Sequence, residues 1–113
     1  MCRIKFGKIN RKSNYFYFQG LNAPAIGGGT AGQFTRAKGF LAYYEICSLV
    51  RSKGWRVVHD PAGTMGPYAY KEDQWVSFDD VNMIRHKAQY VKNMQLGGAM
   101  IWALDLDDFR YTG

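Results

Sequence analysis

Residues 96–109, LGGAMIWALDLDDF, hold the pattern that decides the class of fold. Two glycines are followed by an almost continuously apolar run at residues 99–104 and by an acidic segment at residues 105–108. An apolar run without polar alternation is typical of a parallel strand that is buried on both faces. The stretch therefore predicts a buried strand with acidic side chains at its carboxyl end.

An amphipathic helix is predicted immediately before this strand, at residues 81–95. Its apolar residues recur at three- and four-residue spacing and form one stripe: Val81, Ile84, Ala88, Val91 and Met94. Asp79 and Asp80 precede the helix, and we interpret them as N-terminal caps rather than catalytic acids. A helix, a glycine turn and a buried strand in this order predict an α/β barrel or a doubly wound unit.

The residues before this helix predict a small α+β unit. A helix is expected at residues 39–53, where aromatic and apolar side chains recur at helical spacing and Gly54 supplies a stop. Short strands are expected at residues 55–59, 67–71 and 74–78, with turns between them.

A loop with weak strand character near its end is expected at residues 21–36, which are rich in glycine, alanine and threonine. The glycine run at residues 27–29 lacks the following Lys-Ser/Thr of a phosphate-binding loop. We therefore expect this run to be flexible backbone beside a groove.

The net charge of +6 is concentrated at the N-terminal end. Residues 1–20 carry five basic residues and no acidic one, whereas the other 93 residues carry 10 basic and 9 acidic residues, a net charge of +1. No nucleic-acid partner is expected, because phosphate binding requires a basic face. Residues 1–20 also lack the apolar run of a secretory signal peptide. We expect them to be an atypical leader outside the fold, with a basic functional arm as the alternative.

The length of 113 residues is too short for a closed (β/α)8 barrel, which needs about 250 residues. No apolar stretch approaches the roughly 18 residues that a membrane span requires, so no membrane partner is expected. Aromatic residues make up 16% of the chain, which indicates a packed, aromatic-rich interior or a sugar-binding surface.

Four blocks of the sequence resemble glycoside hydrolase family 18, the chitinases and chitinase-like lectins of animals. They are LNAPAIGGG at residues 21–29, GFLAYYEIC at residues 39–47, QWVSFDD at residues 74–80 and LGGAMIWALDLDDF at residues 96–109. The resemblance implies an α/β fold, the C-terminal part of a (β/α)8 TIM barrel with the family's α+β insertion domain.

The same resemblance implies how the chain is divided. Residues 21–78 would be the insertion domain, which follows the seventh barrel strand and forms one wall of the substrate cleft. Residues 79–113 would hold the seventh helix, at residues 79–95, and the eighth strand, at residues 98–104.

The chemistry implied by the resemblance is substrate-assisted hydrolysis of chitin, in which a glutamic acid protonates the leaving oxygen. That acid belongs to a D-x-x-D-x-D-x-E motif, which these 113 residues do not contain. The two glutamates, Glu45 and Glu72, follow no such motif, so we assign no catalytic residue and expect the chain alone to be inactive. No cofactor or metal is expected, and His59 and His86 lack metal-ligand spacing.

Trp102 is the principal candidate for sugar binding. The resemblance implies that it forms the hydrophobic floor under the sugar at the cleavage site; the sequence alone favours a core tryptophan. Phe40 by resemblance lines the cleft wall, with a core position at the start of a helix as the alternative. Trp75, with Tyr68 and Tyr70, either lines the insertion's face or packs its sheet. The expected partner is chitin or a chitooligosaccharide.

Cys47 bears on the cellular compartment. The resemblance implies a disulfide between this cysteine and one beyond the D-D-F block, which would suit an extracellular parent protein. The sequence ends before such a partner, and Cys2 lies in the atypical leader, so we expect Cys47 to be unpaired. A buried free thiol is the alternative.

Three functions remain open from the sequence. The chain is part of a chitin-hydrolysing enzyme, part of a chitinase-like lectin or growth factor that binds sugar without cleaving it, or a gene piece that does not fold alone. Retention of Trp102 favours the first.

Overall fold

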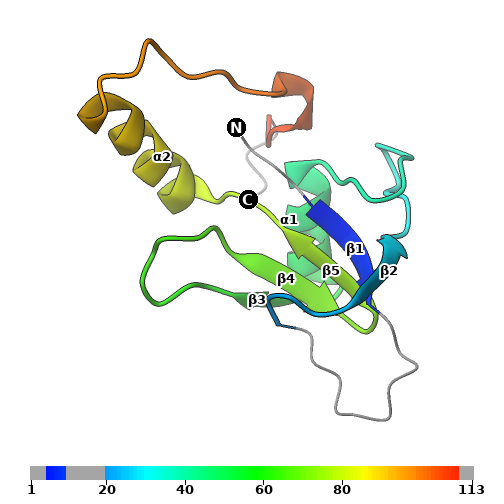
Figure 1. Cartoon of the computed structure of the whole chain (residues 1–113). Helices are drawn as coiled ribbons and strands as arrows, with labels where there is room; N and C mark the ends of the chain where they lie inside the picture. The colour runs from blue at the N-terminus through cyan, green and yellow to red at the C-terminus, as the bar shows by residue number, and fades with distance from the viewer. Residues whose placement is uncertain (1–4, 10–19, 110–113) are drawn as a thin grey trace.

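The computed structural model describes residues 5–9 and 20–109. Figure 1 shows a sheet with one helix against it and a second helix to one side. In chain order the elements are β1 (Lys5–Ile9), β2 (Ala25–Gly28), α1 (Tyr43–Ser52), β3 (Arg56–Val58), β4 (Tyr68–Lys71), β5 (Gln74–Ser77), α2 (Val81–Asn93) and the 3-10 helix η1 (Leu104–Leu106).

The five strands form one antiparallel sheet in the order β2-β1-β5-β4-β3. Strand alternation divides its residues between two faces. Ala69 and Val76 are directly opposite each other and fully buried, and they form the core with Ile46 of α1 and with Leu41 and Phe78. The three strands predicted before residue 79 are therefore confirmed. They could be predicted because the alternation of buried and exposed side chains can be read from each segment alone.

Strand β1 corrects the expectation that residues 1–20 lie outside the fold. It pairs with β2 on one side and with β5 on the other, so Gly7 lies opposite both Gly28 and Trp75. Strand pairing is made by backbone N–H and C=O groups, so the basic side chains of this segment gave no indication of it. Residues 1–4 and 10–19 of the expected leader, Cys2 among them, lie outside the described residues.

Helix α1 begins at Tyr43, four residues later than predicted. Gly39 has a φ of +76°, which is not helical, and Ala42 is extended at the N-cap. The side chain of Glu45 in the first turn accepts a hydrogen bond from the Ala42 amide at 3.0 Å, which caps the helix from inside. The aromatic spacing predicted the helix itself correctly.

The glycine run at residues 27–29 lies at a close crossing of two backbones rather than in a flexible loop. Gly28 belongs to β2, and a Cβ added there would meet the Gly39 backbone at 3.1 Å. Gly29 accepts a hydrogen bond from the Gly39 amide at 3.0 Å. The strand in this region is therefore earlier than expected, and its glycines allow the segment before α1 to approach.

Helix α2 is confirmed, but the buried strand predicted at residues 99–104 is wrong for this chain. Residues 99–103 form no strand, and η1 begins at Leu104. A buried parallel strand needs neighbours on both sides, and no strand of the described residues pairs with this segment. Figure 1 shows it crossing from the end of α2 toward α1.

The apolar stripe predicted on α2 is largely exposed. Val81 is 67% exposed and Ile84 48% exposed, whereas Met83 is the buried residue of the helix. Neither α-helix in the part of the chain that the structure describes is long and apolar enough to cross a membrane.

Candidate functional site

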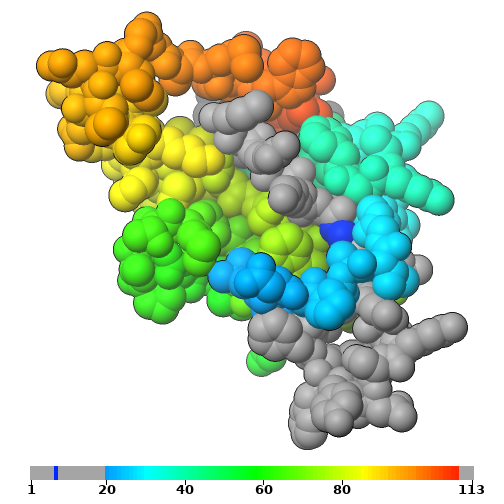
Figure 2. All heavy atoms as spheres, viewed as in Figure 1, coloured from blue at the N-terminus to red at the C-terminus, as the bar shows by residue number. Residues whose placement is uncertain are grey.

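A pocket of about 290 Å³ lies between three segments of the chain. Phe40 comes from the segment before α1 and Tyr43 is the first residue of α1. Val81 and Ile84 come from the first turn of α2, and the remaining apolar wall comes from residues 100–106. Figure 2 shows this last segment, in orange, passing over the top of the molecule from α2 toward the loop before α1. The pocket is therefore built from elements that are distant in sequence.

The structure places Trp102 and Phe40 on the same pocket. Trp102 is 69% exposed, so its indole is not part of a core formed by this chain. Phe40 is half-buried and lines the same pocket from the segment that precedes α1. A concave, mostly apolar surface with three aromatic rings, those of Phe40, Tyr43 and Trp102, suits a ligand that has apolar faces.

The segment that carries Phe40 is fixed by the carboxylate of Glu45. Burial acts to raise the pKa of Glu45, but hydrogen bonds from Ala42, Phe34 and Thr35 outweigh it and lower this pKa below its usual value. Glu45 is therefore an anion inside the protein at neutral pH, and its charge is used to hold a loop.

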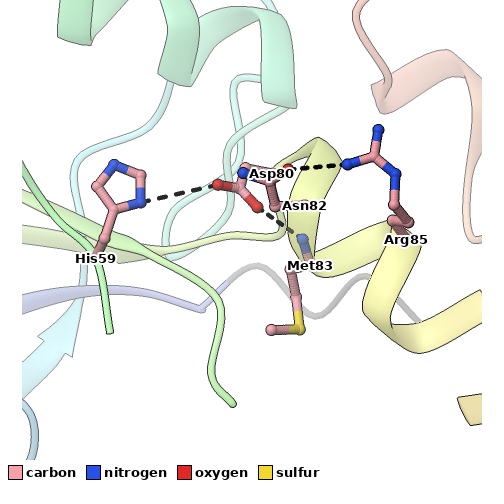
Figure 3. Close-up of polar contacts among 5 residues, drawn as sticks. All are labelled: His59, Asp80, Asn82, Met83 and Arg85. Carbon is pink, nitrogen blue, oxygen red and sulfur yellow. Dashed lines mark hydrogen bonds and ion pairs between the residues drawn. The ribbon is translucent and has the colours of Figure 1, made fainter. Parts of the chain in front are cut away.

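Three aspartates contribute polar groups to the pocket, and each is engaged in a local interaction. Asp80 caps α2, as predicted, by accepting a hydrogen bond from the Met83 amide at 2.8 Å (Figure 3). Asp79 does not cap the helix and instead pairs with Lys87. Asp107 accepts a hydrogen bond from the Asp108 amide at 2.8 Å. These bonds give the three carboxylates structural roles at the pocket.

Figure 3 also shows His59 reaching toward Asp80 from the end of β3, with 3.8 Å between Nδ1 and the carboxylate oxygen. Within residues 5–9 and 20–109, no group of three His, Cys, Asp or Glu side chains is arranged to hold a metal ion.

Tyr43 is a pocket residue that the sequence analysis did not single out. Burial, followed by the neighbouring Cys47, raises the pKa of Tyr43 to about 12. Burial and then Asp108 raise the pKa of Cys47, whose thiol is hydrogen-bonded to the Tyr43 side chain. Among the described residues Cys47 has no disulfide partner. The i, i+4 spacing of this pair on α1 is the signal that identifies their contact.

Trp75 does not lie on the pocket. Its ring stacks on Tyr68 at 5.5 Å between centroids, and Tyr68 stacks on Tyr70 at 6.3 Å. These residues alternate with the buried Ala69 and Val76 and so occupy the sheet face away from the core. The Trp75 Nε1 is buried and has no hydrogen-bond partner within the described part of the chain. The three rings thus form one row on the face of the sheet away from the core, and a role of Trp75 in sugar binding stays a prediction.

Comparison with known proteins identifies relatives of this chain. The Drosophila melanogaster protein named Probable chitinase 10 is 69% identical over 90 residues, which are 80% of this chain and 4% of that protein. Catalytic domain 2 of the Ostrinia furnacalis Group II chitinase has a TM-score of 0.86 at 53% identity, over 95% of this chain and 27% of that one. A second structure of this domain holds penta-N-acetylchitooctaose.

A human pseudo-chitinase with retained chitooligosaccharide binding is also similar. Its TM-score is 0.78 at 42% identity, over 94% of this chain and 27% of that one. The chain thus spans about a quarter of the solved chains that it matches. The family described as Glycosyl hydrolases family 18 matches residues 7–107. The chain belongs to glycosyl hydrolase family 18, the chitinases and chitinase-like proteins, and aligns to part of the family's catalytic domain.

Proposed function

We propose that the pocket shared by Phe40 and Trp102 binds an N-acetylglucosamine unit of chitin or of a chitooligosaccharide. The observation that carries the proposal is the position of Trp102, an indole 69% exposed on the wall of an apolar pocket. The C–H face of a pyranose ring packs on an aromatic ring, while its hydroxyl groups require polar partners at the margin. Tyr43 and Asp107 lie at this pocket and offer such partners.

The position of the chain in a longer protein is the second part of the proposal. Residues 21–78, together with β1, correspond to the α+β insertion, and residues 79–95 to the seventh barrel helix. Residues 98–104 form no strand here and correspond to the position of the eighth strand, which would form only beside neighbouring barrel strands. The exposed stripe of α2 and the exposed side chains of Met100 and Ile101, 63% and 68% accessible, support this assignment. Neighbouring barrel elements would cover these surfaces in the longer protein, which we propose to be extracellular.

The chain by itself binds sugar and does not hydrolyse it under this proposal. The D-x-x-D-x-D-x-E motif is not found in its 113 residues. The carboxylates at the pocket each have a local partner: Asp80 caps α2, Asp79 pairs with Lys87 and Asp107 accepts from the Asp108 amide. These contacts support structural roles for the three aspartates. The longer protein would hydrolyse chitin if it carries the motif.

A chitinase-like lectin is the second candidate for the longer protein. The 42% identity to a human pseudo-chitinase that retains chitooligosaccharide binding favours it. Both candidates use the same pocket and differ in whether the glutamate of the motif is present. Reading that motif in the longer protein separates them: a glutamate at its last position supports the enzyme, and another residue there supports the lectin.

Calorimetric titration of the chain with tetra-N-acetylchitotetraose tests the binding pocket. Trp102→Ala removes the aromatic wall and should weaken binding about tenfold, because truncation of a central aromatic contact costs about 1–2 kcal/mol. Trp75→Phe is the matched control, since it keeps an aromatic ring on the sheet and lies away from the pocket. Equal affinities of the unsubstituted chain and Trp102→Ala would contradict the proposal.

A further inference from the structure

The carboxylate of Glu45 is the centre of a buried polar cluster in the first turn of α1. Glu45 is only 5% exposed. Oε1 accepts hydrogen bonds from the amides of Phe34 at 2.7 Å and Thr35 at 3.2 Å, and Oε2 accepts from the Thr35 hydroxyl at 2.9 Å and the Ala42 amide at 3.0 Å. Hydrogen bonds to an ionised acceptor are about twice as strong as neutral ones, so this one side chain holds two separate points of the preceding loop.

Gly32 closes the remaining side of the cluster. A Cβ at this position would collide with both carboxylate oxygens of Glu45, so any larger residue would displace the carboxylate from its hydrogen bonds to the loop. The Arg36 amide returns to the Gly32 carbonyl at 3.1 Å, which folds the loop around this contact. The shape of residues 32–36 therefore depends on the Glu45 side chain.

Phe40 lies between two fixed points of the same segment. On one side the Gly39 amide donates to the Gly29 carbonyl at 3.0 Å, and on the other the Ala42 amide donates to Glu45. Leu41 between them is 2% exposed and belongs to the core, which leaves Phe40 turned to the pocket. Loss of the Glu45 anchor would free one of the two ends that fix the Phe40 backbone.

The loop also contacts the segment that follows α2. The ring of Phe34 packs edge-on against Tyr44 at 5.8 Å, and Tyr44 packs edge-on against Phe109 at 5.6 Å. Because Glu45 holds the Phe34 amide, the same carboxylate also supports a chain of rings that ends at Phe109, which does not line the pocket.

We propose that Glu45 is a positioning residue of the sugar pocket, whose ionised carboxylate fixes residues 34–42 and so holds Phe40 on the wall that it shares with Trp102. The inference rests on the proposed binding function and adds a residue that does not touch the pocket. Glu45 acts through Phe40, so its contribution to binding exists only while the Phe40 ring is present.

A double-mutant cycle measures this dependence. Glu45→Gln keeps the shape of the side chain, removes its charge and places an NH2 group among donors. It should weaken binding of tetra-N-acetylchitotetraose about fivefold in the unsubstituted chain and leave the affinity unchanged in the Phe40→Ala chain, since coupled residues are non-additive. Asp60→Asn is the matched control: Asp60 also accepts hydrogen bonds from three loop amides and a threonine hydroxyl, but in a loop that does not line the pocket.

Amide hydrogen exchange on the same variants reads the loop directly. In Glu45→Gln the amides of Phe34, Thr35 and Ala42 should exchange about tenfold faster, while those of Ala69 and Val76 in the sheet stay protected, because local openings are independent of global unfolding. If Glu45→Gln does not fold, Thr35→Val replaces it, since it removes the hydroxyl donor alone and should give a smaller change in the same direction.

The outcomes separate the two proposals. Equal losses of affinity with and without Phe40, or faster exchange spread evenly over loop and sheet, would assign Glu45 to general stability and overturn the positioning role alone. Unchanged exchange at Phe34, Thr35 and Ala42 would overturn it as well. Absence of binding by the unsubstituted chain would overturn the proposed function, and the positioning role with it.

Discussion

Trp102 and Phe40 reach the same pocket from segments about 60 positions apart, and each is placed by a different physical means. Phe40 is set by glycines and by the carboxylate of Glu45, which the surrounding backbone satisfies. Trp102 is 69% exposed and is set by the extended segment between α2 and η1. The pocket therefore has one firmly held wall and one wall with few contacts of its own.

Acid should loosen the firmly held wall. The pKa of Glu45 is lowered in the folded chain, so its contribution to stability is fully present above the unfolded value of about 4.3 and is lost as pH falls through the lowered folded value. Urea unfolding at pH 7 and at pH 3 should show a larger loss of stability in the unsubstituted chain than in Glu45→Gln. An identical pH dependence in both would contradict this role of the carboxylate.

The sequence indicated Phe40 and Trp102 as site residues but not Glu45, because the contacts of Glu45 form only in the folded loop. Phe40 and Trp102 belong to continuous blocks, GFLAYYEIC and LGGAMIWALDLDDF, whose resemblance to a known family implied a cleft position. Glu45 lies in the first of these blocks, but its donors come from residues 34–42, and only the folded loop brings them to the carboxylate. A charged residue in an aromatic helix carries no signal of such partners.

At the scale of elements, local periodicity was sufficient where burial is decided within the element or by its sequence neighbours. Strands β3, β4 and β5 and helix α2 were predicted to within a few residues for this reason. Strand β1 was missed because its partners, β2 and β5, are recognised through backbone pairing across distant sequence. The strand expected at residues 99–104 did not form because a sheet strand requires neighbours that the described residues do not supply.

The N-terminus of α2 depends on Asp80. Asp80→Ala removes the acceptor for the Met83 amide and should destabilise the helix by about 1 kcal/mol. Amide exchange should become faster along α2 and remain unchanged in β4 and β5. Asp80→Asn is the control, because asparagine caps helices about as well as aspartate, and it should restore protection. Equal exchange in the alanine and asparagine variants would show that the cap is not what stabilises α2.

The whole molecule consists of a packed sheet-and-helix unit and a more open part formed by α2 and residues 94–109 (Figure 1). The radius of gyration is 14.9 Å, above the value of about 13 Å for a compact domain of this length. The open part carries exposed apolar side chains, among them Met94, Leu96, Met100, Ile101 and Leu104. In the proposed longer protein these side chains would be covered, which accounts for their apolar character.

The N-terminal strand should be essential to the packed unit. Gly7→Pro removes a backbone donor in the interior of the sheet and should lower the free energy of unfolding by about 2 kcal/mol, because a ladder acceptor loses its partner. Gly7→Ala is the matched control, since an added Cβ would meet only ordinary contacts at 3.8 Å from Ala25 and from the Gly27 carbonyl. Urea unfolding measures both variants. Equal stabilities of the proline and alanine variants would show that β1 does not belong to the folded unit.

The proposed pocket is tested most directly by nuclear magnetic resonance of the three tryptophan indoles during titration with tetra-N-acetylchitotetraose. Trp55, Trp75 and Trp102 give one indole N–H signal each. If the sugar binds at the pocket, the Trp102 signal shifts with increasing sugar and the Trp75 signal, which belongs to the far face of the sheet, stays in place. A shift of Trp75 with Trp102 unmoved, or no shift of any indole, would contradict the sugar-binding pocket.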